Sequence, residues 1–72
     1  MFVYTSHAEQ RIEQRNLSVA QIEETVLQPD KVFAGFKQRM LARRDFSGNI
    51  LEVIYRRQED NIIIITAYWM DE

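Results

Sequence analysis

The chain has 72 residues, a net charge of −2, one histidine and no cysteine. The absence of cysteine excludes disulfides, thiolate metal sites and a cysteine nucleophile, and a single histidine argues against a structural zinc site. The length predicts one small domain over residues 1–72, and no metal ion or other cofactor is expected.

Capping signals mark the first predicted helix. Ser6 with Glu9 three residues later is a capping box, so the helix is expected to begin at His7. Asn16 can adopt the left-handed conformation that ends a helix. Ala8 and Ile12 form the apolar stripe of this segment.

A second helix is predicted directly after the first. Ser18 and Gln21 form another capping box, and Leu17 is placed to pack against Ile22. Because the residue before a proline disfavours helical geometry, this helix is expected to stop before Pro29.

After residue 29 the apolar period changes from helical to alternating. Four strands are expected, at residues 31–36, 39–46, 50–57 and 62–69, with turns at 47–49 and 58–61. The sequence therefore predicts an α+β fold in which two N-terminal helices pack on a four-stranded, mainly antiparallel sheet.

The last predicted strand is almost continuously apolar, which is typical of a central strand buried on both faces. Strict alternation would place Thr66 and Tyr68 on the same face as Ile62 and Ile64, with Ala67 on the other face. A hydroxyl in such a strand either pairs with the backbone or lines a cleft.

Charge is unevenly distributed along the chain. The segment 31–57 is rich in basic residues and holds only two carboxylates, whereas both ends of the chain are acidic. This middle segment either presents a local positive face or solvates the outer side of a sheet. Its arginines and lysines are Lys31, Lys37, Arg39, Arg43, Arg44, Arg56 and Arg57.

His7, Arg11 and Arg15 recur every four residues and so share one face of the first helix. An imidazole can act as a general base, and two guanidinium groups can bind a phosphate and stabilise added negative charge on it. The alternative is an ordinary solvated helix face on which these side chains pair with Glu9 and Glu13.

The segments "SHAEQRIEQRNLS" (6–18), "LQPD" (27–30) and "NIIIITAYW" (61–69) together resemble a family of short bacterial proteins with an H-A-x-x-R-x-x-x-R helix. That family is grouped with the barnase–EndoU–colicin–RelE (BECR) superfamily of metal-independent ribonucleases, and the resemblance covers nearly the whole chain. It implies a RelE-like fold and the toxin of a toxin–antitoxin pair.

The resemblance also implies roles for individual residues. His7 becomes the catalytic base or acid, Arg11 and Arg15 become phosphate ligands, and Thr66 becomes the polar residue of the last strand. The basic strand residues of RelE-like toxins would correspond to Arg39, Arg43 or Arg44. Apart from the resemblance, the rings of Tyr55 and Tyr68 either stack on bases or belong to the core.

Three functions are therefore open. The first is a metal-independent endoribonuclease whose partners are RNA and a cognate antitoxin protein. The second is a non-catalytic module that binds RNA or a protein on the same fold. The third is a homodimer that covers the apolar last strand.

The chain is expected to be cytoplasmic, because it lacks cysteine and a signal-peptide pattern. The longest apolar run, residues 62–65, is far too short to cross a bilayer.

Overall fold

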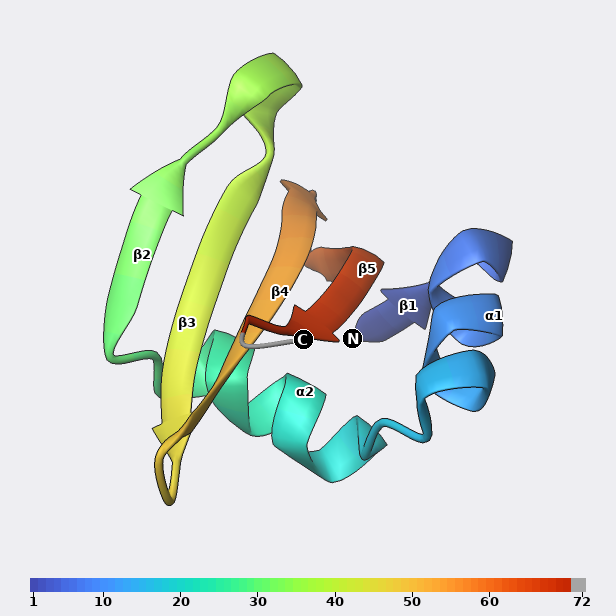
Figure 1. Ribbon diagram of the computed structural model, residues 1–72. Helices are drawn as coiled ribbons and strands as arrows, with labels where there is room; N and C mark the ends of the chain where they lie inside the picture. Colours follow the sequence, from blue (N-terminus) through green and yellow to red (C-terminus); the bar gives the residue numbers. More distant parts are fainter. Residues whose placement is uncertain (71–72) are drawn as a thin grey trace.

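The computed structural model describes residues 1–70. Two helices lie beside one twisted sheet (Figure 1). The elements, in chain order, are β1 (Phe2–Tyr4), α1 (Ser6–Arg15), α2 (Val19–Leu27), β2 (Lys31–Ala34), the short 3-10 helix η1 (Phe36–Gln38), β3 (Met40–Phe46), β4 (Asn49–Gln58) and β5 (Asn61–Trp69).

The sheet has five strands in the order β1-β5-β4-β3-β2. Strand β1 pairs with β5 in parallel, and the other neighbours are antiparallel. The α+β class is confirmed, but the expected four-stranded, mainly antiparallel sheet was wrong by one strand. The three residues of β1 are too few to show an alternating pattern. Their partner strand, β5, lies at the other end of the chain, where Ile62 pairs with Phe2.

Helix α1 begins one residue earlier than predicted. Thr5, rather than Ser6, is its N-cap: the Thr5 hydroxyl accepts a hydrogen bond of 3.0 Å from the backbone N–H of Ala8. The backbone N–H of Thr5 also donates to the carbonyl of Ile64 at 3.2 Å. The parallel pairing of β1 therefore fixes where α1 starts.

The other helix boundaries follow the sequence signals. Asn16 caps the end of α1 with a left-handed φ of 53°. The Ser18 hydroxyl accepts from the backbone N–H of Gln21, and α2 ends at Leu27, before Pro29. No helix within residues 1–70 is long and apolar enough to cross a membrane.

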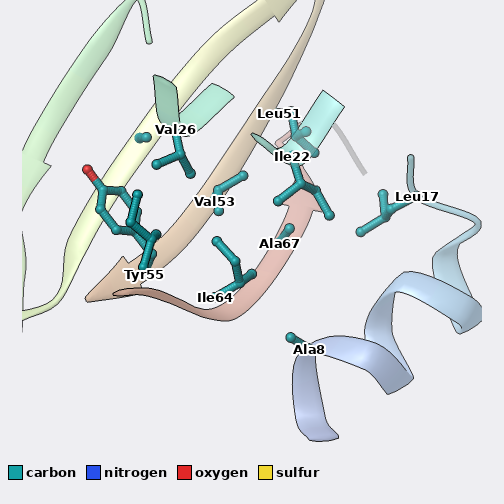
Figure 2. Packing of buried hydrophobic residues seen from close by; sticks show 11 residues of the cluster. Ala8, Leu17, Ile22, Val26, Leu51, Val53, Tyr55, Ile64 and Ala67 are labelled. Atoms are coloured by element: carbon teal, nitrogen blue, oxygen red, sulfur yellow. The ribbon is translucent and has the colours of Figure 1, made fainter. Parts of the chain in front are cut away.

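The core lies between the helices and one face of the sheet. Helix α1 packs on β5 and β1, and α2 packs on β4 and β3. Figure 2 shows Ile22 and Val26 of α2 directed at the inward side chains of the sheet, with Ala8 of α1 further off, on the side of Ile64. The sheet contributes Ala42, Leu51, Val53, Tyr55, Ile62, Ile64 and Ala67 to this core.

A β-bulge in β5 changes which residues face the core. Ile54 pairs with Thr66 but Tyr55 pairs with Ile64, so Ile65 has no partner in β4. A bulge shifts the alternation by one residue. Ala67 is consequently buried on the same side as Ile64, which contradicts the face assignment made from strict alternation.

The bulge also places Thr66 and Tyr68 on the face opposite Ile62 and Ile64. Strand β5 lies between β1 and β4, but the expectation that it is buried on both faces was wrong. Ile63, Ile65 and Thr66 are only half-buried, because the helices cover one face of the sheet.

The connection from β2 to β3 differs from the sequence prediction. Strand β2 ends at Ala34 instead of residue 36, because residues 36–38 form η1, where Lys37 and Gln38 have positive φ. Arg39 consequently lies just outside β3. The turn between β3 and β4 was predicted: Ser47 (φ 57°) and Gly48 (φ 97°) make a two-residue turn typical of hairpins.

Candidate functional site

The face of the sheet opposite the helices, called the open face below, has no helix packed on it within residues 1–70. The register aligns two rows of side chains across it. Along each row the strands are about 4.8 Å apart, so neighbouring side chains touch. The first row is Phe33, Leu41, Ile54 and Thr66, and the second is Lys31, Arg43, Glu52 and Tyr68.

Glu52 occupies the centre of the second row. Its carboxylate is only 3% exposed although it lies on the open face. The Nε of Arg43 donates to Glu52 Oε2 at 2.5 Å, and the hydroxyl of Tyr68 donates to Glu52 Oε1. Both oxygens are thereby paired, which is the condition for burying a carboxylate without a large loss of stability.

Tyr68 connects this row to helix α1. Its hydrogen bond to Glu52, together with partial burial, raises the pKa of the Tyr68 hydroxyl, so the group is protonated at neutral pH. Arg15 Nη1 donates to the carbonyl of Ala67 at 3.3 Å, and its guanidinium lies 6.0 Å from the centre of the Tyr68 ring. Arg15 and Tyr68 are therefore adjacent, as a shared site requires.

Arg43 presents a partly free guanidinium on the open face. Its group lies 4.7 Å from the centre of the Phe33 ring, a distance that permits a cation–π contact. It uses Nε for Glu52. Among the hydrogen bonds formed within residues 1–70, none involves its two terminal nitrogens, so these donors are open to a ligand.

Arg44, the next residue, lies on the helix-covered side. Its Nε is 2.9 Å from Glu24 Oε2, and its Nη1 donates to the carbonyl of Gln28 at 2.6 Å. These contacts hold the end of α2 against β3. The bonds of Arg44 therefore lie on the side opposite those of Arg43, although both arginines line one hollow together with Asp30, Lys31, Asp45 and Ile50.

The His7 stripe is only partly joined to the sheet. His7 is exposed in the first turn of α1, and Arg11 Nη1 donates to Gln14 at 3.2 Å within the same helix. Arg15 is the member of the stripe whose side chain bonds to β5. Thr66 lies half-buried on the open face, in the row of Phe33 and not in that of Arg43.

The two sides of the molecule carry opposite charge. On the open face Lys31, Arg43 and Arg56 outnumber the carboxylates, Asp45 and Glu52, and Arg15 adds a further cation at its border. Carboxylates gather instead on the helices, at Glu9, Glu13, Glu23 and Glu24. The cations of the open face thus exceed its carboxylates by one, or by two with Arg15, although the total charge of the chain is negative.

One hollow on the helix side is lined by Tyr4, Glu9, Ile12, Glu13 and Val19. Beside it, the hydroxyl of Tyr4 donates to Glu23 Oε2 at 2.6 Å. Within residues 1–70, no three His, Asp or Glu side chains are grouped closely enough to hold a metal ion.

Comparison with known protein families identifies the family to which the chain belongs. A model of a domain of unknown function, DUF4258, matches residues 4–69. The chain belongs to the DUF4258 family. No curated protein and no solved structure matches it. The DUF4258 match extends from β1 to the end of β5, so every candidate residue named above lies inside the family domain.

Sequence reasoning missed Glu52, Lys31 and Phe33 as members of the site. The alternation of Leu51 and Val53 does indicate that Glu52 faces away from the core. The partners of Glu52 follow only from the register, which places Arg43 and Tyr68 on either side of it. In this DUF4258 domain the site is therefore defined by strand pairing more than by local motifs.

Proposed function

We propose that this protein is a metal-independent endoribonuclease of the BECR type, acting as the toxin of a toxin–antitoxin pair. The observation that carries the proposal is the row of cations and aromatic rings on the open face, with Arg15 from the His7 stripe beside Tyr68. Exposed aromatic rings interleaved with guanidinium groups are suited to unstacked bases and to phosphates.

Charge supports RNA as the substrate. The open face is positive while the helices are acidic, so a polyanion is attracted to one side of the molecule. Within residues 1–70 the two terminal nitrogens of Arg43 form no hydrogen bond, and their paired N–H groups match the geometry of a phosphate. Phe33, 41% exposed next to Arg43, offers a ring to a neighbouring base.

In the proposed reaction the exposed imidazole of His7 takes the proton of a ribose 2′-hydroxyl. The 2′-oxygen then attacks the adjacent phosphorus, and the bond from phosphorus to the 5′-oxygen breaks. The leaving 5′-oxygen takes a proton from water, and the product carries a 2′,3′-cyclic phosphate. Arg11 and Arg15 would stabilise the extra negative charge on the phosphate during the attack.

The test is an incubation of purified protein with total RNA in EDTA, beside His7→Ala. Gln10→Ala, an exposed change on the same helix, is the matched control. We expect cleavage by the wild type and by the control, and at least about a hundredfold loss in His7→Ala, because general-base catalysis contributes that much. Equal cleavage by wild type and His7→Ala would contradict the catalytic role.

A non-catalytic RNA-binding module is the second candidate. It is favoured by one observation: Arg15 bonds to the sheet at Ala67, whereas His7 is exposed and its placement adds nothing to the cation–aromatic row. In this case RNA binding would fall steeply with salt, and no cleavage would be seen over hours. Binding and cleavage measured on the same samples separate the two candidates.

A further inference from the structure

Glu52 is a buried carboxylate that the proposed reaction does not use. Glu52 is 3% exposed. Other side chains in its row on the open face are at least partly exposed, and that of Arg43 is 34% exposed. A buried ion pair contributes little net stability compared with apolar residues of similar size. The fold alone therefore gives no reason for a carboxylate at this position.

The geometry around Glu52 suggests what it does. Strand β4 lies between β3 and β5, so a side chain at this position reaches one partner on each neighbouring strand. Glu52 bonds Arg43 through Nε and Tyr68 through the hydroxyl. Because Glu52 is bonded through Nε, the terminal nitrogens of Arg43 keep N–H donors that a phosphate can use.

We propose that Glu52 is a positioning residue, which holds the Arg43 guanidinium and the Tyr68 ring in fixed places on the open face so that both meet one RNA chain. This inference rests on the proposed binding of RNA. Without Glu52, a long arginine side chain must be immobilised at the moment of binding, and the loss of its rotamer freedom weakens the complex.

The informative change is Glu52→Gln, which keeps the shape of the side chain. A glutamine has one acceptor oxygen and one NH2 group, so it cannot offer separate oxygens to Arg43 and Tyr68, and its NH2 group faces one of these two donors. Glu24→Gln is the matched control: it removes the same charge from the partner of Arg44, on the opposite side of the sheet. Any effect of net charge alone is therefore common to both variants.

The first measurement needs no RNA. The ring resonances of Tyr68, assigned by comparison with Tyr68→Phe, are followed by NMR as pH rises. Glu52→Gln should lower the pKa of Tyr68 towards its usual value, because the hydrogen bond that Tyr68 donates to Glu52 contributes most to raising it. Glu24→Gln should leave the titration unchanged. An unchanged titration in folded Glu52→Gln would overturn the inference.

The second measurement is a double-mutant cycle on the affinity for a single-stranded oligoribonucleotide. Arg43→Gln should weaken binding about tenfold when Glu52 is present, and less than about threefold in the Glu52→Gln background. Glu52→Asp, which restores two acceptor oxygens, should recover part of the coupling. Equal losses from Arg43→Gln in both backgrounds would show that Glu52 does not position Arg43.

The two proposals fail in different ways. If the wild type binds no oligoribonucleotide while Glu52→Gln still shifts the Tyr68 titration, RNA binding is wrong and the positioning contact is real. If RNA binds but the cycle is additive, RNA binding stands and the positioning role is wrong. Should Glu52→Gln fail to fold, Tyr68→Phe removes the other hydrogen bond of Glu52 and can replace it in the cycle.

Discussion

Arg43 and Arg44 are neighbours in the sequence, yet they belong to opposite sides of the sheet. Arg44 is tied to Glu24 and to the carbonyl of Gln28, and so it fastens helix α2 to β3. Arg43 is tied by one nitrogen to Glu52, and its two terminal nitrogens form no hydrogen bond within residues 1–70. The same residue type thus fastens a helix on one side and leaves donors unpaired among the described residues on the other.

The comparison extends to the whole sheet. The helix-covered side is apolar and closely packed around Ile64 and Val53, which are fully buried. The open face alternates cations, aromatic rings and half-buried aliphatic side chains such as Ile54. Because strand residues alternate between faces, a single strand can serve the core and a binding surface together.

The largest expected effect is a difference in stability loss between two adjacent isoleucines on opposite faces, Ile64 and Ile63. Ile64→Ala should lower the free energy of unfolding by about 3 kcal/mol, because it leaves a cavity in the core. Ile63→Ala should lower it by about 1 kcal/mol, since its side chain is only half-buried. Urea denaturation measures both.

If Ile64→Ala does not fold, Ile64→Val and Ile63→Val give the same comparison on a smaller scale, with about 1 kcal/mol expected for the buried residue. Equal losses at the two positions would mean that the open face is covered in solution, for instance by a second copy of the chain. The contrast between the two faces would then be wrong.

Much of the fold could be predicted from local signals. The cap at Ser18, the left-handed Asn16 and the hairpin turn at Gly48 act over a few residues, and each lies where the sequence indicated. Strand β1 and the bulge at Ile65 could not be predicted, since both depend on pairing between distant segments. The bulge alone reversed the faces assigned to half of β5.

The candidate site was less accessible to sequence reasoning. The shared face of His7, Arg11 and Arg15 follows from helical periodicity, but contact of Arg15 with Tyr68 depends on how α1 packs on β5. Arg43 and Arg44 were taken together, although alternation within β3 separates them. The charge separation between faces is a tertiary property, which a net charge of −2 conceals.

The next prediction tests the arginine contrast directly. Arg43→Gln should weaken binding of an oligoribonucleotide about tenfold and reduce the salt dependence by about one phosphate contact. Arg44→Gln should change RNA affinity less than about twofold while lowering stability slightly, because its ion pair with Glu24 is partly exposed. Filter binding at several salt concentrations gives both quantities. Equal losses of affinity would remove the distinction between the faces.

The smallest expected effect compares two tyrosine–glutamate pairs, one on each side of the sheet. Tyr4 donates to Glu23 among the helices, and Tyr68 donates to Glu52 on the open face. Burial and the hydrogen bond donated to Glu23 raise the pKa of Tyr4, and the hydrogen bond donated to Glu52, with partial burial, raises the pKa of Tyr68.

A raised pKa means that the folded protein binds the phenolic proton more tightly than the unfolded chain does. The resulting stability is complete below the usual tyrosine pKa of about 10 and is lost as pH rises through the higher folded value. Tyr4→Phe and Tyr68→Phe should each lower stability by about 1 kcal/mol at pH 8. Each difference from wild type should shrink as urea denaturation is repeated towards pH 11.

RNA binding at pH 8 should distinguish the two variants. Tyr68→Phe removes one hydrogen bond of Glu52 and should weaken RNA binding. Tyr4→Phe should leave RNA binding unchanged, because Tyr4 lies on the helix side. A loss of RNA affinity in Tyr4→Phe would mean that RNA binds on the helix side and not on the open face.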